Sequence, residues 1–415
     1  MKQIKEGVEL MAPAGSFESL MASIQAGADS VYFGIEQLNM RARSSNNFTL
    51  EDLEEICKIC KARGIKTYLT LNTIVYDHDL KLMKGIIDAA LANGVNAIIA
   101  SDHAVFNYAR KIGMPVHVST QANVSNIDTV EFYASHADVI VLSRELSLMQ
   151  VEAIVREIRR KAITGPSDEL VKIEIFAHGA LCMAVSGKCY LSLHTDFASA
   201  NRGACIQNCR QSYIVTDKEK GTELEIDNEY IMSAKDLCTI DFLDQVLSAG
   251  VSVLKIEGRG RSPEYVATVT SCYREAIDAI KSNTFTPEKA AAWKERLSTV
   301  FNRGFWDGYY LGRTMGEWSN VYGSRATKQK IYVGKGMKYF EEVKVGEFRL
   351  EAQSLALYDE ILITGPTTGV IQTTIKELRV DGKPAERVNK GELFSIPLDQ
   401  KIRPSDKLYK LTDIS

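Results

Sequence analysis

Hydrophobic positions in the first two thirds of the chain fall into short runs separated by longer segments of mixed polarity. Four runs, at residues 26–35, 93–102, 136–145 and 249–258, form a weak internal repeat, in which a small-residue turn precedes an apolar, β-branched run that ends in polar residues. Four further runs lie at 8–15, 65–72, 114–121 and 173–179. Continuous apolar runs of this length are typical of strands buried on both faces, so the pattern predicts eight parallel strands.

The segments between these runs carry apolar residues at a spacing near 3.6, which predicts amphipathic helices. The predicted helices cover residues 17–26, 50–63, 79–92, 101–112, 126–135, 145–160, 235–248 and 263–280. Thr49 and Gly64 flank the second helix as an N-cap and a C-terminal glycine. Eight alternating strands and helices predict an α/β fold, a (β/α)8 TIM-like barrel over residues 1–280, with an open doubly wound sheet as the alternative.

The last third of the chain has a different pattern of hydrophobic and polar residues. Residues 281–327 form a connector of helical and aromatic character, which includes FNRGFWDGYYLGR at 301–313. Residues 328–415 alternate between apolar and polar positions in short runs, with turn signals every 8–12 residues. This pattern predicts a C-terminal small all-β barrel domain.

Composition and charge narrow the class of protein. Hydrophobic residues make up 45% and charged residues 25% of the chain, as in ordinary globular proteins, and the net charge of −3 gives no general basic field for nucleic acid. The amino terminus lacks the apolar core of a signal peptide, and no run approaches the ~20 apolar residues of a membrane span. We therefore expect a cytoplasmic protein with no membrane partner, whose eight cysteines stay reduced.

Polar and charged side chains recur just after the predicted strands. The positions are Asn72, Asp102, Gln121, Asn123, Arg144, Glu145, His178, Glu257 and Arg259. In a parallel barrel the carboxyl ends of the strands meet at one face, where active sites are built. The recurrence predicts a functional site at that face, although any single one of these residues is more often an ordinary loop residue.

Four of the cysteines are concentrated in a loop at 179–215, after the seventh strand. Their spacing is Cys182-x6-Cys189-x15-Cys205-x3-Cys209, and glycines between them allow the loop to fold back on itself. Four thiolates hold either a structural zinc ion or an iron–sulfur cluster. Because zinc sites usually contain CxxC pairs, which this loop lacks, the spacing favours a 4Fe–4S cluster.

Other readings of the cysteines remain open. Cys189 with His178 or His194 could form a nucleophilic pair, and Cys238 could return to the same face as an alternative fourth ligand. Cys57, Cys60 and Cys272 lie at helical core positions.

Several long motifs resemble a known family. They are ELMAPAGSFESLMASIQAGADSVYFG, GALCMAVSGKCYLS, NRGACIQNCR, MSAKDLC and VLKIEGRGRSPEYV. The chain resembles the collagenase-like peptidases of unknown catalytic type, over about residues 8–280. It carries neither the Gly-x-Ser-x-Gly elbow of serine hydrolases nor the HExxH helix of zinc proteases, so proteolysis is the weaker expectation.

The resemblance implies an RNA-modifying hydroxylase. Relatives with a carboxyl-terminal β domain hydroxylate the wobble uridine of tRNA to 5-hydroxyuridine, and others act on a 23S rRNA cytidine or on a ubiquinone precursor. The implied cofactor is a 4Fe–4S cluster on Cys182, Cys189, Cys205 and Cys209, and the implied co-substrate is prephenate. The implied partner is tRNA, and the resemblance allows a homo-oligomer or a paralogous partner subunit.

The resemblance and the chemistry together assign roles to the remaining residues. Prephenate is a dianion and needs cationic partners, whereas amide side chains can read a base edge. Arg41 and Arg43 could contact RNA phosphates. We expect a catalytic group of His178, Arg144, Lys255, Glu257 and Arg259, and a cofactor-binding group of Arg202, Arg210, Asn72, Gln121 and Asn123.

Overall fold

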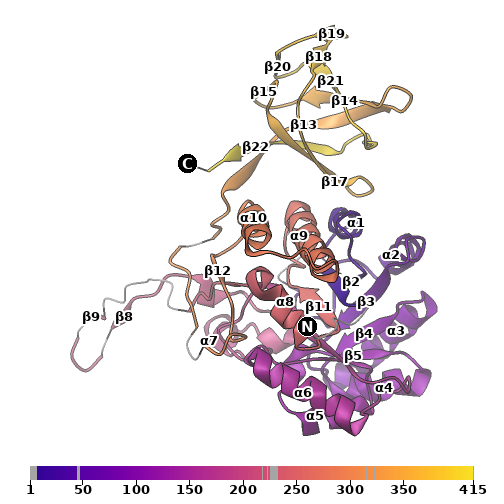
Figure 1. The fold of residues 1–415 in the computed structure, drawn as a ribbon, viewed down its shortest axis with the longest axis vertical. Coiled ribbons are helices and arrows are strands. Elements are labelled where there is room, and N and C mark those ends of the chain that lie inside the picture. Colours follow the sequence, from indigo (N-terminus) through magenta and orange to yellow (C-terminus); the bar gives the residue numbers. More distant parts are fainter. Residues whose placement is uncertain are drawn as a thin grey trace.

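The computed structural model shows a barrel and a separate β domain (Figure 1). It describes residues 7–43, 47–216, 218–221, 223–224, 232–313, 316–321 and 323–414. The β domain, orange to yellow in Figure 1, stands over the helices α9 (Pro263–Lys281) and α1 (Phe17–Gln25) on the outside of the barrel.

Eight parallel strands close the predicted barrel. They are β1 (Glu9–Pro13), β2 (Ser30–Phe33), β3 (Lys66–Leu71), β4 (Ala97–Ala100), β5 (Val116–Val118), β6 (Val139–Val141), β7 (Lys172–Ala180) and β11 (Val253–Ile256). Neighbouring strands pair in this order, and β11 pairs with both β1 and β7, which completes the ring. The closed ring confirms the TIM-like barrel and excludes the open sheet.

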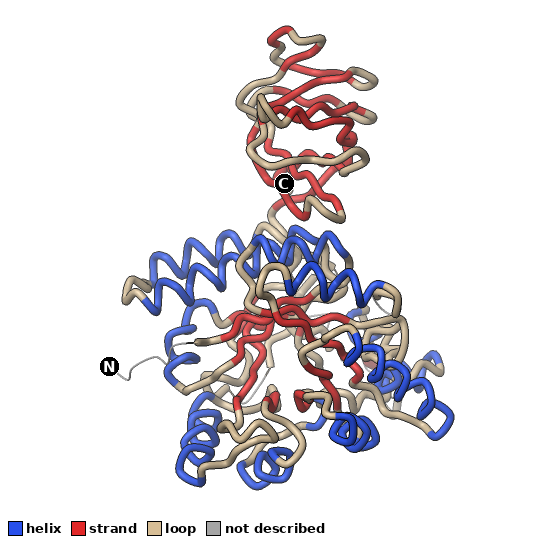
Figure 2. Tube along the Cα trace, turned by 90° about the vertical axis from the view of Figure 1, so that its right-hand side faces the viewer, coloured by secondary structure: helices blue, strands red, loops and turns tan. Residues whose placement is uncertain are grey.

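Helices surround the strands, as Figure 2 shows. With α1 and α9 they are α2 (Asp52–Lys61), α3 (Leu80–Ala92), α4 (His103–Ile112), α5 (Ile127–Ala134), α6 (Leu148–Lys161) and α8 (Leu243–Ser248). Local sequence sets their ends: the Asp102 carboxylate accepts from the Ala104 amide at the start of α4, and Gly113 ends that helix at a φ of 76°. The thiols of Cys57, Cys60 and Cys272 are buried in the core, as predicted.

The prediction of one helix over residues 235–248 is wrong in its first half. Residues Asp236–Cys238 form a short strand, β10, and the helix α8 starts only at Leu243 after a 3-10 turn. The cause is the neighbouring strand: β10 pairs antiparallel with the last residues of β7, where His178 lies opposite Cys238. Tertiary pairing therefore overrides the helical pattern of this segment.

The connector packs onto this extra strand. Its helix α10 (Pro287–Ser298) is followed by β12 (Phe305–Trp306), which pairs parallel with β10. The Tyr310 hydroxyl donates to the Phe176 carbonyl oxygen of β7 at 2.9 Å, and the Tyr310 carbonyl accepts from the Leu148 amide at 2.9 Å. The connector is therefore part of the barrel's wall.

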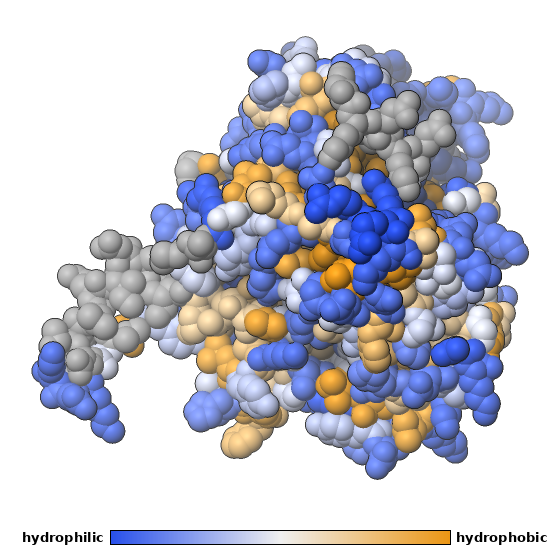
Figure 3. Space-filling view, turned by 60° about the horizontal axis from the view of Figure 1, so that its bottom comes forward, coloured by the Kyte–Doolittle hydropathy of each residue, from blue (hydrophilic) through white to orange (hydrophobic). Residues whose placement is uncertain are grey.

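The carboxyl-terminal residues form an all-β domain with its own core, as predicted for this region. Its main strands are β13 (Lys328–Phe340), β14 (Val345–Leu350), β16 (Glu360–Gly365), β17 (Gly369–Thr374), β21 (Leu393–Pro397) and β22 (Lys407–Asp413), which pair antiparallel in one sheet. Gln25 of α1 donates to the Thr368 carbonyl at 2.8 Å, and Lys330 pairs with Glu264 of α9 at 2.8 Å. Figure 3 turns the bottom of the molecule in Figure 1 toward the viewer, and there orange apolar groups are scattered among blue hydrophilic ones.

Candidate active site at the barrel mouth

A cavity of about 1170 Å³, including its opening to solvent, lies at the carboxyl ends of the barrel strands. Side chains from the strands form its floor, among them Tyr32, Thr70, Ile99, Val141, Phe176 and Lys255. Residues that follow the strands form its sides, and the cysteine segment (residues 180–210) covers one side. Of the predicted site residues, the cavity brings together Asn72, Gln121, Arg144, Lys255, Glu257, Arg259, Arg210, Cys182, Cys189, Cys205 and Cys209.

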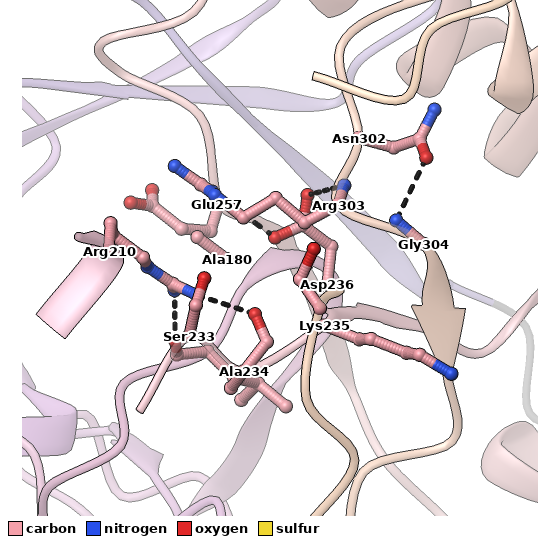
Figure 4. Close-up of polar contacts among 12 residues, drawn as sticks. Ala180, Arg210, Ser233, Ala234, Lys235, Asp236, Glu257, Asn302, Arg303 and Gly304 are labelled. Carbon is pink, nitrogen blue, oxygen red and sulfur yellow. Dashed lines mark hydrogen bonds and ion pairs between the residues drawn. The ribbon is translucent and has the colours of Figure 1, made fainter. Parts of the chain in front are cut away.

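The cysteine segment is held in place by its neighbours. Gly179 at the end of β7 has a φ of 108°, which turns the chain out of the barrel. At the other end, the Arg210 guanidinium donates to the Ser233 hydroxyl at 3.1 Å and to the Ala234 carbonyl oxygen at 2.5 Å (Figure 4). It also donates to the Leu181 carbonyl oxygen at 2.6 Å. Arg210 therefore clamps the start and the end of the cysteine segment together.

Four thiols line this one cavity. All four cysteines are free, and Cys182 is exposed while the other three are partly buried. Burial raises the pKa of the Cys209 thiol, and the nearby thiols of Cys182, Cys205 and Cys189 raise it further, whereas Arg210 lowers it. Among the residues that the structure describes, no group of three His, Cys, Asp or Glu side chains has the close geometry of a bound metal.

The donor set nevertheless fits an iron–sulfur cluster. Cluster ligands are cysteine thiolates, and four unpaired thiols that share one cavity meet that requirement without carboxylate or imidazole help. Their mutual repulsion when deprotonated also favours a shared cation or cluster between them.

Next to the thiols lies a partly buried ion pair. Arg41 contacts the Glu257 carboxylate at 2.6 Å, and the Tyr32 hydroxyl lies 3.2 Å from the same carboxylate. Burial alone would raise the pKa of Glu257, but the charges of Arg41 and Arg259 lower it to about 2. Glu257 is therefore ionised at neutral pH and acts as an acceptor.

A second buried pair supports the floor of the cavity. Lys255 donates to the Glu174 carboxylate at 2.8 Å, and the His117 imidazole lies 3.5 Å from the same carboxylate. Burial opposes ionisation of Glu174, but Lys255 and His117 still hold its pKa below the usual range. The Lys255 ammonium also lies 4.5 Å from the centroid of the Tyr32 ring, so it is held between the Glu174 carboxylate and that ring.

Three guanidinium groups in the cavity have neutral hydrogen-bond partners. Arg259 donates to the Asn39 side-chain oxygen at 3.0 Å and the Thr70 hydroxyl at 2.8 Å, and burial lowers its pKa to about 10. Arg144 donates to the Ala180 carbonyl at 3.1 Å and stacks over the Phe176 ring at 4.2 Å. Arg210 binds only neutral oxygens among the described residues, so the cavity carries more positive than negative charge and suits an anionic ligand.

Two amides form a polar edge of the cavity. The Asn72 amide donates to the Gln121 side-chain oxygen at 3.1 Å, and its own oxygen accepts from the Met40 amide at 3.2 Å. The Gln121 oxygen also accepts from the Ser119 hydroxyl. The loops after β3 and β5 thus present hydrogen-bonding groups side by side.

Three predicted site residues lie outside the cavity lining. His178 is buried against Tyr273, Tyr265 and Phe305, and burial together with Arg261 lowers its pKa to about 3. Arg202 pairs with Asp79 at 2.6 Å. Asn123 donates to the Gln121 carbonyl at 2.8 Å.

Cys238 also lies outside the cavity lining. It is buried beside Tyr273, and burial raises the pKa of its thiol to about 11. The structure therefore groups Cys182, Cys189, Cys205 and Cys209 without it.

Some residues of the site lie outside the strand-end pattern that the sequence shows. Tyr32 and Glu174 lie inside apolar strand runs, where a lone polar residue is normally read as a tolerated exception. Both side chains point into the barrel. A Glu inside a buried strand is a useful signal of a site, because its charge requires a cationic partner. Arg41 comes from the loop after β2, and only the closed barrel brings it to Glu257.

Comparison with known proteins places the chain in a family. Residues 15–320 match the model described as Peptidase family U32, and the chain belongs to that family. A protein named collagenase from Porphyromonas gingivalis is 59% identical over 402 residues, which cover 97% of this chain and 97% of that protein.

Two other relatives have names from RNA modification. The tRNA hydroxylation protein P1 of Bacillus subtilis is 32% identical over 412 residues, which cover 97% of this chain and 94% of that protein. A 23S rRNA 5-hydroxycytidine synthase of Escherichia coli is 31% identical over 422 residues, covering 98% of this chain and 59% of that protein. In the described part of this chain, no helix is long and apolar enough to cross a membrane.

Proposed function

We propose that this protein is an iron–sulfur-dependent RNA hydroxylase that converts the wobble uridine of tRNA to 5-hydroxyuridine. The observation that carries the proposal is the composition of one cavity: four free thiols lie beside the guanidinium groups of Arg144, Arg210 and Arg259, whose hydrogen-bond partners are neutral. A relative named for tRNA hydroxylation matches nearly the whole chain, including its β domain. An RNA substrate would place the reaction in the cytoplasm.

In this proposal Cys182, Cys189, Cys205 and Cys209 hold a 4Fe–4S cluster. The cluster supplies electron transfer or a Lewis-acidic iron when it is bound. Replacing the C5–H of uridine by C5–OH oxidises the base by two electrons, so an oxygen donor must be reduced in the same site. The excess positive charge suits a dianionic donor, and prephenate is the candidate.

The side chains of this chain then have separate tasks. Arg144 and Arg259 bind the carboxylates of the anion, because their own partners are neutral. Glu257 stays ionised and holds Arg41 at the cavity wall. Asn72 and Gln121 offer hydrogen-bonding amide groups to a ligand in this cavity.

Nucleoside analysis tests this proposal. We expect mass spectrometry of tRNA from a strain that lacks this protein to show loss of 5-hydroxyuridine and its derivatives, and the wild-type gene to restore them. Unchanged levels would contradict the tRNA assignment. Loss of 5-hydroxycytidine from 23S rRNA instead would identify 23S rRNA as the substrate.

A second candidate function is cleavage of collagen-like peptides, which the 59% identical relative named collagenase favours. The cavity gives little support to this function, because His178 is buried away from the thiols with which it would have to form a nucleophilic pair. Incubation of the purified protein with denatured collagen separates the two: the hydroxylase proposal predicts no new fragments, and fragments that disappear in a Cys182→Ala variant would support the peptidase.

A further inference from the structure

A second, smaller pocket adjoins the main cavity. It measures about 400 Å³ including its opening, and it shares Arg144, Leu181, Cys182 and Met183 with the main cavity as a common wall. Its other side consists of aromatic side chains from the connector, Trp306, Tyr309 and Trp318. We call it the aromatic pocket, and no role described above uses it.

The aromatic rings of this pocket are held at defined positions. Trp306 is buried in β12, donates from Nε1 to the Lys235 carbonyl at 3.2 Å, and packs edge-on against Tyr309 at 5.4 Å. Trp318 is bridged to Ala234 through the backbone, and its side chain is 37% exposed. A Cβ atom at Gly316 would lie 3.6 Å from the Trp318 ring and 3.7 Å from the Trp306 ring, so a glycine leaves the space between the rings open.

Two charged side chains complete the pocket. The Glu145 carboxylate lines it and accepts from the Ser143 hydroxyl. Arg144 lines both cavities, and its Nε is buried without a hydrogen-bond partner among the described residues. The pocket therefore offers flat apolar surfaces together with one acceptor and one cationic donor.

This combination matches a single unstacked pyrimidine. A uracil ring presents an N–H donor and carbonyl acceptors on one edge and flat faces on both sides, and proteins that act on a base bind it by stacking and by hydrogen bonds to that edge. A peptide side chain would use the aromatic surfaces but would leave the paired acceptor and donor unmatched.

We propose that the aromatic pocket binds the target pyrimidine of the RNA, with the base against Trp318 and its polar edge toward Glu145 and Arg144. This inference rests on the proposed RNA hydroxylase function and deepens it. It places the base beside Cys182 and leaves the main cavity to the anionic co-substrate, so that Arg144 contacts both ligands.

Tryptophan fluorescence gives a direct test, because the chain has three tryptophans and two of them line the aromatic pocket. The third, Trp293, is buried in α10, where it stacks on Phe285 and donates to Glu275. In a Trp293→Phe variant all remaining tryptophan emission comes from the pocket. We expect saturable quenching by an anticodon-arm RNA hairpin and about tenfold weaker binding of the same hairpin with an abasic wobble position.

Equal quenching by the two hairpins would overturn the assignment, and so would quenching by a collagen-derived peptide in place of RNA. Two matched variants can be compared by their kinetics with tRNA. Trp318→Ala should raise the KM for tRNA about tenfold, whereas Trp318→Phe should keep a KM close to that of the wild type. An unchanged KM in Trp318→Ala would also overturn the assignment. Absence of tRNA hydroxylation by the wild-type enzyme would contradict the proposed function, while the hairpin titration would still decide what the pocket binds.

Discussion

Among the single side chains, Glu257 shows most clearly how burial and charge shape the site. Its carboxylate is partly buried and remains ionised because Arg41 and Arg259 lie close to it. A buried charge of this kind is costly to isolate, so loss of one partner affects the others. The pair fixes the position of Arg41, which the loop after β2 alone would not determine.

A Glu257→Gln variant should reveal this coupling through pH. The fall of the Glu257 pKa from 4.5 to about 2 contributes stability that is present above pH 4.5 and is lost as pH falls toward 2. The shift corresponds to about 3 kcal/mol. Thermal melts should therefore show a gap between wild type and variant that is largest at neutral pH and shrinks below pH 4.5; a constant gap would contradict the ion pair.

The four cysteines make a second prediction at this level. Single Ala substitutions of Cys182, Cys189, Cys205 or Cys209 should remove the absorbance near 400 nm of anaerobically purified protein, because each supplies one cluster ligand. Cys238→Ala is the matched control, since Cys238 is buried outside the cavity. If Cys238→Ala alone loses the absorbance, the ligand set is wrong.

Among the secondary-structure elements, β7 links the barrel to the cysteine segment. Its first half pairs with β11 inside the ring, and its last residues pair with β10 outside it. Gly179 lies at this change of partner, where a Cβ atom would be 2.5 Å from the Glu257 carbonyl oxygen. The backbone after β7 and the backbone after β11 therefore pack so closely that position 179 has no room for a side chain.

Gly179→Ala tests this arrangement. The positive φ and the steric clash should destabilise the barrel by about 2 kcal/mol and lower the cluster content, because the cysteine segment starts at this point. Gly85→Ala is the control: Gly85 lies in the interior of α3 with open space around it, so alanine should stabilise the helix by about 1 kcal/mol. Differential scanning calorimetry measures the stability of both variants. A Gly179→Ala variant as stable as the wild type would contradict the proposed constraint.

The elements also show what could be predicted from the sequence. The eight barrel strands follow from apolar runs, because burial on both faces leaves a strong local signal. The residues at strand ends, such as Arg144 and Arg259, follow from the barrel rule. The strand β10 and the inward Tyr32 could not be predicted, because they depend on pairing and closure between segments distant in the chain.

The described part of the molecule consists of a barrel and a β domain joined by the connector. The barrel core and the β-domain core are separate clusters, and the two parts meet through α1, α9 and β17. Separate cores allow one domain to lose stability while the other keeps its structure. The site lies entirely in the barrel and its connector.

A Phe394→Ala variant tests this independence. Phe394 is buried in the β domain and stacks on Phe348 at 5.5 Å, so its loss should destabilise that domain by about 3–5 kcal/mol. Calorimetry should show one transition shifted down, while the absorbance near 400 nm of the purified protein stays at the wild-type level. If the whole protein unfolds at a lower temperature and the absorbance near 400 nm is lost as well, the two domains fold as one unit.

The most direct measurement of the central claim is the iron and acid-labile sulfide content of the wild-type protein purified without oxygen. The four thiols that line one cavity predict about four iron and four sulfide per chain, with absorbance near 400 nm. A colourless protein that carries a single zinc ion and no sulfide would contradict the account.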